Sequence, residues 1–229
     1  MEDKRNLINN TKKTAIVVGA SGLTGGFLLQ QLAQDKTFER IIVLSRKAMK
    51  PALPKVREVV VDFENLGRYD FWPDVDVLFC CVGTTIKKAG SQENFRKVDH
   101  DIPVALAEQC ALYNVGYHFM SSIGADAESS NFYLKTKGET EEELKQADLP
   151  YLYIYRPSVL VGPRQESRLG ESIGKIFIAL AYPFLLGSLK KYRGIHVGKI
   201  AAAMIKNAKN WALGVHVFES DEIKKSIEI

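Results

Sequence analysis

Short runs of β-branched and other apolar residues alternate along this chain with segments of helical periodicity. Before residue 157, the apolar runs lie at 14–19, 40–44, 56–61, 74–82, 117–120 and 151–155. Helical spacing covers 23–33, 92–113 and 133–146, and Pro103 interrupts the second of these segments. Strands that alternate with helices across short turns build a parallel sheet with right-handed crossovers. The sequence therefore predicts an α/β fold with a Rossmann-like, doubly wound parallel sheet.

The alternation breaks down after Pro157. Residues 170–189 are apolar, residues 197–209 are helical by pattern, and residues 214–218 form one last short strand-like run. A length of 229 residues fits one domain, or one domain with a small appendage.

We therefore expect a single domain over residues 1–229, with a Rossmann core at 14–156 and a small helical cap at 157–229. The cap should cover the cleft at the carboxyl edge of the sheet, because ligands bind at that edge in open α/β sheets.

Composition and charge exclude several classes of protein. Lys and Arg number 31 and Asp and Glu number 27, and the resulting charge of +4 is too small to indicate nucleic-acid binding. The first residues lack the apolar stretch of a signal peptide. The cysteines, Cys80, Cys81 and Cys110, lack the spacing of a disulfide framework or a metal site. Reduced thiols in a cytoplasmic protein are the expectation.

Residues 173–189 are strongly apolar, with Lys175 and Lys190 near the ends of the stretch. The stretch is broken by Pro183 and is too short to span a bilayer, so no integral membrane segment is expected. Two interpretations remain open. The segment packs as a cap helix over the substrate cleft, which we favour, or it makes peripheral contact with a membrane surface.

A glycine-rich turn follows the first apolar run. Gly19, Gly22 and Gly25 form the pattern G-x-x-G-x-x-G between a strand and a helix. In that context the first glycine permits a tight turn, the second lets the backbone approach a pyrophosphate, and the third lets the helix pack close to the strand. The free N–H groups of the new helix favour phosphate. The sequence therefore predicts a dinucleotide site.

The end of the second run indicates which dinucleotide binds. A site that prefers NAD places an acid there to accept a hydrogen bond from the ribose. This chain has Ser45, Arg46 and Lys47 instead, and two cations suit a 2′-phosphate. We therefore expect NADP(H); the alternative is a solvated surface pair with no ligand.

Further cofactor contacts are expected where later strands end. Asp62 and Phe63 follow the third run, where the acid could accept from the adenine or simply cap the next turn. Val82, Gly83 and Thr84 lie at the end of the fourth, where the glycine could admit the cofactor ribose or merely end the strand.

The end of the sixth run offers two interpretations of its own. Pro157 and the residues up to Leu160 could shape the nicotinamide pocket. Arg156 could instead pair with a nearby acid.

A proton-transfer group is predicted around Tyr133 and Lys137, which lie four residues apart and therefore share a helical face. A phenol keeps its proton to a pH of about 10, and a nearby ammonium favours the deprotonated form. Such a pair can exchange a proton with a carbonyl or alcohol beside a hydride carrier. Ser121 or Ser122, at the end of the fifth run, could hold the reacting oxygen. The histidines are scattered, so no metal site is expected.

These residues resemble the atypical branch of the short-chain dehydrogenase/reductases, and more narrowly the Tat-interacting protein family. The resemblance runs from Gly19 to about Glu171 and rests on GASGLTG, SRK, VVDFENL, CCVGTTIKKAG, SSIGAD, SSNFYLKTKGE and RPSVLVGPRQESR.

The resemblance implies a Rossmann-like core with bound NADPH. It assigns the following residues to the site: Ser21, Gly22, Leu23 and Thr24 to the phosphates, Arg46 and Lys47 to the 2′-phosphate, Val82 and Gly83 to the cofactor, Tyr133 and Lys137 to acid–base chemistry, and Leu160 and Arg168 to the cleft.

Two functions fit this pattern. The first is an NADPH-dependent oxidoreductase that reduces an unidentified carbonyl-like substrate with Tyr133 as the acid. The second is an NADPH-sensing regulatory or scaffold protein with little or no turnover, in which binding is coupled to a partner. The chain should be a monomer or a homodimer, since the helices at 92–113 and 133–146 could form a dimer face.

Overall fold

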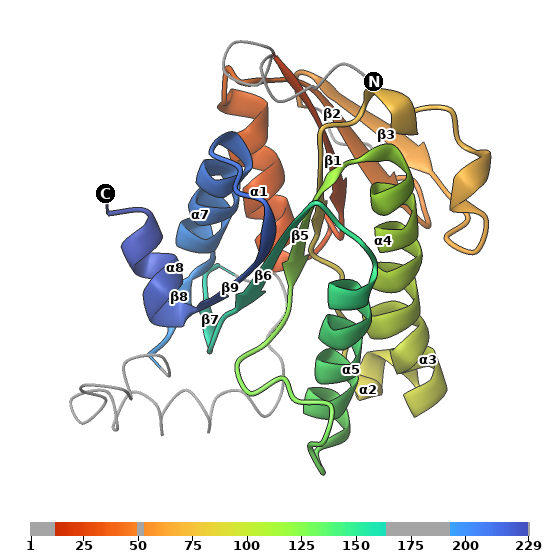
Figure 1. Cartoon of the computed structure of the whole chain (residues 1–229), viewed down its shortest axis with the longest axis vertical. Helices are drawn as coiled ribbons and strands as arrows, with labels where there is room; N and C mark the ends of the chain where they lie inside the picture. The colour runs from red at the N-terminus through yellow and green to blue at the C-terminus, as the bar shows by residue number, and fades with distance from the viewer. Residues whose placement is uncertain (1–11, 50–52, 164–192, 229) are drawn as a thin grey trace.

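The computed structural model describes residues 12–49, 53–163 and 193–228. Its centre is a seven-stranded sheet with the order β3-β2-β1-β4-β5-β6-β9, in which every neighbouring pair is parallel (Figure 1). The strands are β1 Lys13–Val18, β2 Phe38–Ser45, β3 Val56–Val60, β4 Val77–Cys80, β5 Gly116–Met120, β6 Tyr151–Arg156 and β9 Gly214–Glu219. A small second sheet pairs β7 Leu160–Val161 with β8 Ile195–His196. The predicted Rossmann-like α/β fold is confirmed.

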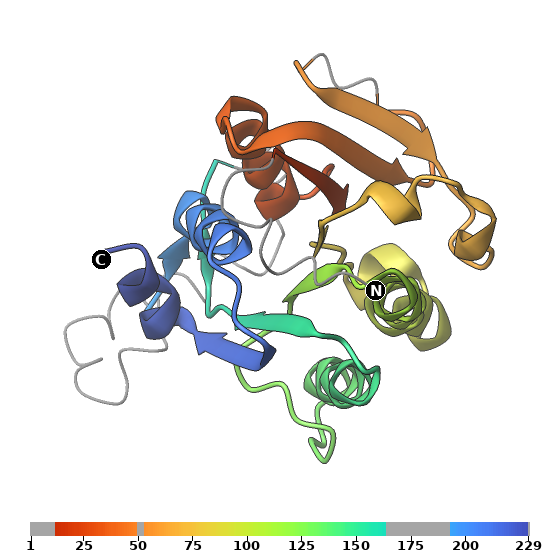
Figure 2. The same cartoon turned by 45° about the horizontal axis from the view of Figure 1, so that its top comes forward.

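Helices cover both faces of the large sheet (Figure 2). One face carries α1 Leu23–Gln34 and α7 Val197–Lys209, and the other carries α4 Ile102–Tyr113 and α5 Phe132–Gln146. The shorter helices are α2 Ile86–Ala89, α3 Gln92–Arg96, the π-helix η4 Lys97–Asp101, α8 Ser220–Ser226 and the 3-10 turns η2 Leu66–Arg68 and η3 Trp72–Asp74.

Strand β1 is apolar at successive positions because helices cover both of its faces. Ala15 and Val17 belong to the core under α1 and α7, whereas Ile16 and Val18 belong to the core under α4 and α5. Successive side chains of a strand point to opposite faces, so a central strand covered on both sides needs apolar residues at every position.

The long helical segment at 92–113 is interrupted as predicted, and the interruption is a π-helical turn between α3 and α4. Pro103 lies in the first turn of α4 and has no N–H to donate to the carbonyl of Asp99. The hydroxyl of Thr140 on α5 shares its hydrogen between that carbonyl, over 3.2 Å, and the carbonyl of Thr136, over 2.7 Å. The freed acceptor thereby joins the two helices.

The core extends beyond the predicted boundary at residue 156, and this corrects the expectation that all of 157–229 forms a cap. Strand β9 pairs with β6 as the seventh strand, and α7 packs beside α1 (Figure 1). The aromatic rings of β6 and β9 stack across the strand pair, as between Tyr155 and Phe218, whose ring centroids are 5.6 Å apart. Stacking of these rings across the two strands stabilises the pairing of β9 with β6.

Arg168 and the apolar stretch at 173–189 lie outside the described residues. Within the described part of the chain, no helix is long and apolar enough to cross a membrane.

Candidate functional site

The glycine-rich turn joins β1 to α1 at the carboxyl edge of the sheet. Gly19 has φ +85°, and a Cβ atom there would lie 2.5 Å from the carbonyl oxygen of Cys81. A Cβ atom on Gly25 would lie 2.3 Å from the carbonyl oxygen of Gly19. The first and third glycines are therefore required by close backbone approach, as the sequence predicted.

The amino end of α1 is open to a ligand. Gly22 caps the helix without a side-chain hydrogen bond, and the first turn contains no acid. Ser21 and Gly22 are exposed, Leu23 is half-buried and Thr24 is buried. Free N–H groups and a positive helix end suit a phosphate, so these residues fit a dinucleotide.

The predicted 2′-phosphate residues, Arg46 and Lys47, are both exposed directly after β2. Their loop is anchored by Glu58 on β3, which was not among the predicted site residues. Its carboxylate accepts hydrogen bonds from the Ser45 hydroxyl over 3.0 Å and from the Met49 backbone N–H over 2.6 Å.

Asp62 performs the turn-capping role that the sequence left open. Its carboxylate accepts from the Glu64 backbone N–H over 3.1 Å and from the Asn65 amide over 2.6 Å. These hydrogen bonds, that of Asn65 first, hold the pKa of Asp62 below its ordinary value. Phe63 is half-buried against the neighbouring core. The contact of Asp62 and Phe63 with adenine stays a prediction.

The chain after β4 runs beside the glycine-rich turn. The Val82 backbone nitrogen lies within 2.8 Å of the position that a Cβ on Gly19 would occupy. The next residue, Gly83, is exposed, and the backbone N–H of Thr84 donates to Oδ2 of Asp99 over 2.8 Å. The segment after β4, which is predicted to bind the ribose, is thus held by a carboxylate from the π-helical turn η4.

Asp99 also pairs with the predicted catalytic lysine. Its Oδ1 lies 3.0 Å from Nζ of Lys137, with side-chain exposures of 1% and 4% respectively. Burial alone would lower the pKa of Lys137, but the acidic groups around it, the carboxylate of Asp99 first, outweigh burial, and the pKa lies above its ordinary value. The ammonium also lies 5.0 Å from the centroid of the Phe119 ring. Lys137 is therefore a buried, charged group.

Tyr133 lies one helical turn before Lys137 in α5. Its ring is half-buried, 6.0 Å from that of Phe95. Helix α5 begins at this point because the side chain of Asn131 accepts from the backbone N–H of Leu134 over 3.2 Å. The predicted Tyr–Lys pair thus lies on the first turns of one helix.

Helix α5 packs closely under the loop that follows β5. A Cβ atom on Gly138 would lie 2.2 Å from the backbone of Asp126 and Ala127. This glycine was not singled out from the sequence, although it directly follows Lys137.

The two candidate serines have different environments. The hydroxyl of Ser121 is buried and donates to Glu141, which is itself 0% exposed. Glu141 also accepts hydrogen bonds from Arg156, a bifurcated one from Nε over 3.0 and 3.1 Å and another from Nη2 over 2.5 Å, so the acid-pairing interpretation of Arg156 is confirmed. Ser122 is half-buried, and its hydroxyl makes only a long contact of 3.4 Å to the carbonyl of Ile123.

Pro157 and Leu160 adjoin this region. The carbonyl of the buried Pro157 accepts from the Ile123 backbone N–H over 3.0 Å. Leu160 is half-buried in β7. A Cβ atom on Gly162 would lie 3.5 Å from the Leu23 side chain, so this segment reaches the start of α1.

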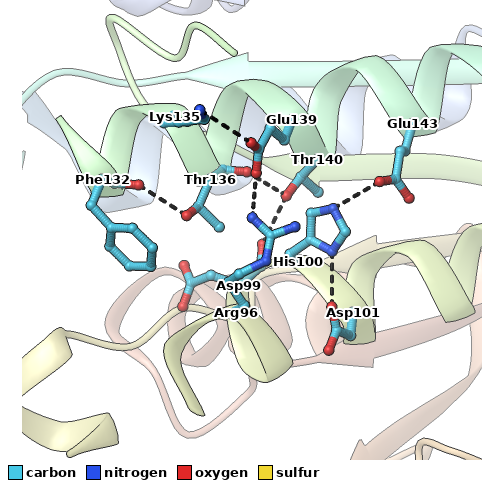
Figure 3. A network of polar contacts seen from close by, with 10 residues as sticks. All are labelled: Arg96, Asp99, His100, Asp101, Phe132, Lys135, Thr136, Glu139, Thr140 and Glu143. Atoms are coloured by element: carbon cyan, nitrogen blue, oxygen red, sulfur yellow. Dashed lines mark hydrogen bonds and ion pairs between the residues drawn. The ribbon is translucent and has the colours of Figure 1, made fainter. Parts of the chain in front are cut away.

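A polar network holds α5 against the end of α3 and the π-helical turn η4 (Figure 3). Arg96 pairs with Glu139, and the imidazole of His100 lies 2.9 Å from Glu143 through Nε2 and 2.9 Å from Asp101 through Nδ1. Together with the Thr140 hydroxyl, these contacts fix the helix that carries Tyr133 and Lys137.

Sequence reasoning missed Asp99 and Glu141, although a signal for each existed. Asp99 lies four residues after Phe95 and seven before Leu106, on the buried face of its helix. Glu141 likewise lies between the buried positions Lys137 and Leu144. An acid on an otherwise buried face needs a partner, and that requirement points to a nearby cation.

Comparison with known proteins places the chain in a family. Residues 14–104 match the family described as semialdehyde dehydrogenase, NAD binding domain. Protein HTATIP2 of Rattus norvegicus is 38% identical over 173 residues, which cover 72% of this chain and 70% of the relative. The mitochondrial protein FMP52 of Eremothecium gossypii is 32% identical over 224 residues, which cover 91% and 95%. The chain belongs to the HTATIP2/FMP52 family. The predicted resemblance is confirmed, and the domain is an NAD(P)-binding Rossmann domain.

Solved structures agree on the fold. The Bordetella bronchiseptica enzyme WbmH in complex with NAD+ superposes with a TM-score of 0.66 at 13% identity, covering 93% of this chain and 79% of that one. The UDP-glucose 4-epimerase of Thermus thermophilus in complex with NAD gives 0.65 at 17% identity, covering 94% and 81%. The domain therefore shares the fold of these two proteins.

Proposed function

We propose that this member of the HTATIP2/FMP52 family is an NADPH-dependent oxidoreductase that reduces a carbonyl-like substrate. The observation that carries the proposal is the buried, charged Lys137 one turn from Tyr133, on a helix fixed at the carboxyl edge of the sheet. The ion pair with Asp99 offsets the cost of burying this ammonium and keeps it charged. A charged ammonium one helical turn from a phenol can support acid–base chemistry of that phenol.

The cofactor preference rests on the loop after β2. Arg46 and Lys47 are exposed cations, and Glu58 fixes the loop that carries them. A guanidinium can bind a 2′-phosphate through two hydrogen bonds, whereas neither cation can accept a hydrogen bond from a ribose hydroxyl. The residues therefore fit NADPH better than NADH.

Each side chain has one role in the proposed reaction. Bound NADPH would supply a hydride to the carbonyl carbon. The phenol of Tyr133 donates its proton to the carbonyl oxygen, and the ammonium of Lys137 stabilises the phenolate that remains. The hydroxyl of Ser122 donates a hydrogen bond to the same oxygen. We propose Ser122 for this role because the hydroxyl of Ser121 is occupied by Glu141.

The test is NADPH consumption, followed at 340 nm, with a panel of aldehydes and ketones. We expect turnover with at least one compound, and its loss in Tyr133→Phe with NADPH affinity within a few-fold of wild type. Tyr151→Phe, on β6, is a matched control that should retain activity. Full activity in Tyr133→Phe would refute the mechanism. Tight NADPH binding without turnover of any compound would favour the NADPH-sensing alternative instead.

The cellular compartment is a separate proposal. The composition favours the cytoplasm, whereas the FMP52 relatives are named mitochondrial. Fractionation of cells that express the chain should place it with cytosolic markers; recovery with mitochondria would contradict the cytoplasmic location.

A further inference from the structure

The lysine of the acid–base pair has a built-in counter-ion. The carboxylate of Asp99 lies 3.0 Å from Nζ of Lys137 through Oδ1, and Oδ2 accepts from the backbone N–H of Thr84. Both charged side chains are almost completely buried. The charge of the ammonium is therefore balanced within the protein, next to the segment that is expected to run beside the cofactor.

The titratable groups around Lys137 come from three elements. Asp99 lies on η4, Tyr133 lies on α5 itself, and Cys80 and Cys81 lie at the end of β4. Burial raises the pKa of both thiols, which keeps them neutral. Among the described residues, Asp99 therefore supplies the carboxylate in direct contact with this ammonium.

The position of Asp99 is fixed from several sides. Pro103 frees its carbonyl, and that carbonyl accepts from the Thr140 hydroxyl over 3.2 Å, in a hydrogen bond shared with the carbonyl of Thr136. On either side of Asp99, Arg96 pairs with Glu139 and His100 with Glu143, so the kinked turn is bonded to α5 before and after it (Figure 3). These contacts hold the turn against α5, and the Thr84 backbone N–H holds the carboxylate of Asp99 itself.

This arrangement has a consequence for the phenol. A lone buried ammonium strongly favours a nearby phenolate, whereas an ammonium paired with a carboxylate exerts a much weaker field. We propose that Asp99 is a charge-balancing positioning residue, whose carboxylate offsets Lys137 so that Tyr133 retains its proton at neutral pH. The inference deepens the proposed function: it sets the site to donate a proton to a carbonyl rather than to remove one from an alcohol.

The ionisation of Tyr133 can be measured without a substrate or cofactor. The full chain is labelled with tyrosine carrying carbon-13 at Cζ, and the Tyr133 signal is assigned by its absence from Tyr133→Phe. The midpoint of its ionisation is then followed by NMR against pH. In Asp99→Asn we expect the midpoint to fall by at least about one pH unit, because the ammonium then acts unopposed. Glu142→Gln removes an acid from the outer face of α5, where it pairs with Lys145, and should leave the midpoint unchanged.

Asp99→Asn leaves a buried ammonium unpaired and could fail to fold. A second variant therefore tests independently whether Asp99 offsets the charge of Lys137. Asp99→Asn combined with Lys137→Gln removes both charges, and its midpoint should return to within about half a unit of wild type. A single-variant midpoint equal to or above that of wild type would overturn the proposal. A double-variant midpoint clearly above wild type would do so too, because it would mean that Lys137 acts on the phenol without an opposing charge. Turnover plays no part in this readout, so failure of the reductase proposal would leave the result intact.

Discussion

Acidification should destabilise this protein through one buried histidine. His118 lies in the middle of β5 and is 1% exposed. Its ring stacks on that of Tyr153 at 4.6 Å and packs against Phe79 at 4.9 Å. Nδ1 lies 3.0 Å from the hydroxyl of Tyr155. Burial among these rings lowers the pKa of His118 from 6.5 to about 3.

The magnitude follows from linkage. The unfolded chain binds a proton at this histidine below pH 6.5, whereas the folded chain does so only near pH 3. The stability contribution is therefore fully present above pH 6.5 and is lost as the pH falls. Between pH 8 and pH 5 the loss from this one group is about 2 kcal/mol, since each pH unit below 6.5 costs about 1.4 kcal/mol.

Denaturation in urea at pH 8 and pH 5 measures this effect. His118→Phe keeps the stacked ring and removes the titrating group. The variant should lose about 1 kcal/mol at pH 8 with the hydrogen bond to Tyr155. Between pH 8 and pH 5 it should lose about 2 kcal/mol less than wild type. Equal losses in the two proteins would show that His118 is protonated in the folded state, and the reasoning would be refuted.

Three further predictions concern the framework of the site. Gly138→Ala should lower the free energy of unfolding by about 1–3 kcal/mol in urea, because its Cβ would meet backbone at 2.2 Å, whereas Gly67→Ala meets only a flexible side chain at 3.7 Å and should be tolerated. Glu141→Ala should cost about 3 kcal/mol by leaving Arg156 unpaired, and a loss under 1 kcal/mol would contradict a structural ion pair. In calorimetry, Arg46→Ala should weaken NADPH binding about tenfold and leave NADH unchanged; equal weakening of both would contradict 2′-phosphate recognition.

Much of the fold followed from local pattern. The helix predicted at 197–209 is α7, and each predicted apolar run contains or overlaps a strand of the parallel sheet. These elements were predictable because each buries a regular set of apolar residues against a neighbour. The membership of β9 in the large sheet was not predictable, because it depends on stacking with β6 across a separation of about sixty residues, as for Tyr155 and Phe218.

The site divides in the same way. Gly19 and Gly25 were predictable because backbone geometry imposes glycine at those positions. The choice between Ser121 and Ser122 was not, since it depends on Glu141, twenty residues along the chain from Ser121. Asp99 was missed for a similar reason: its role arises only when η4 and α5 pack together.

The most direct test of the central claim is isothermal titration of the purified chain with NADPH and with NADH. We predict that both bind and that NADPH binds at least about tenfold more tightly, a difference of about 1.4 kcal/mol. Equal affinity, or tighter binding of NADH, would contradict the role given to Arg46 and Lys47. Binding of neither nucleotide would contradict the proposed oxidoreductase itself.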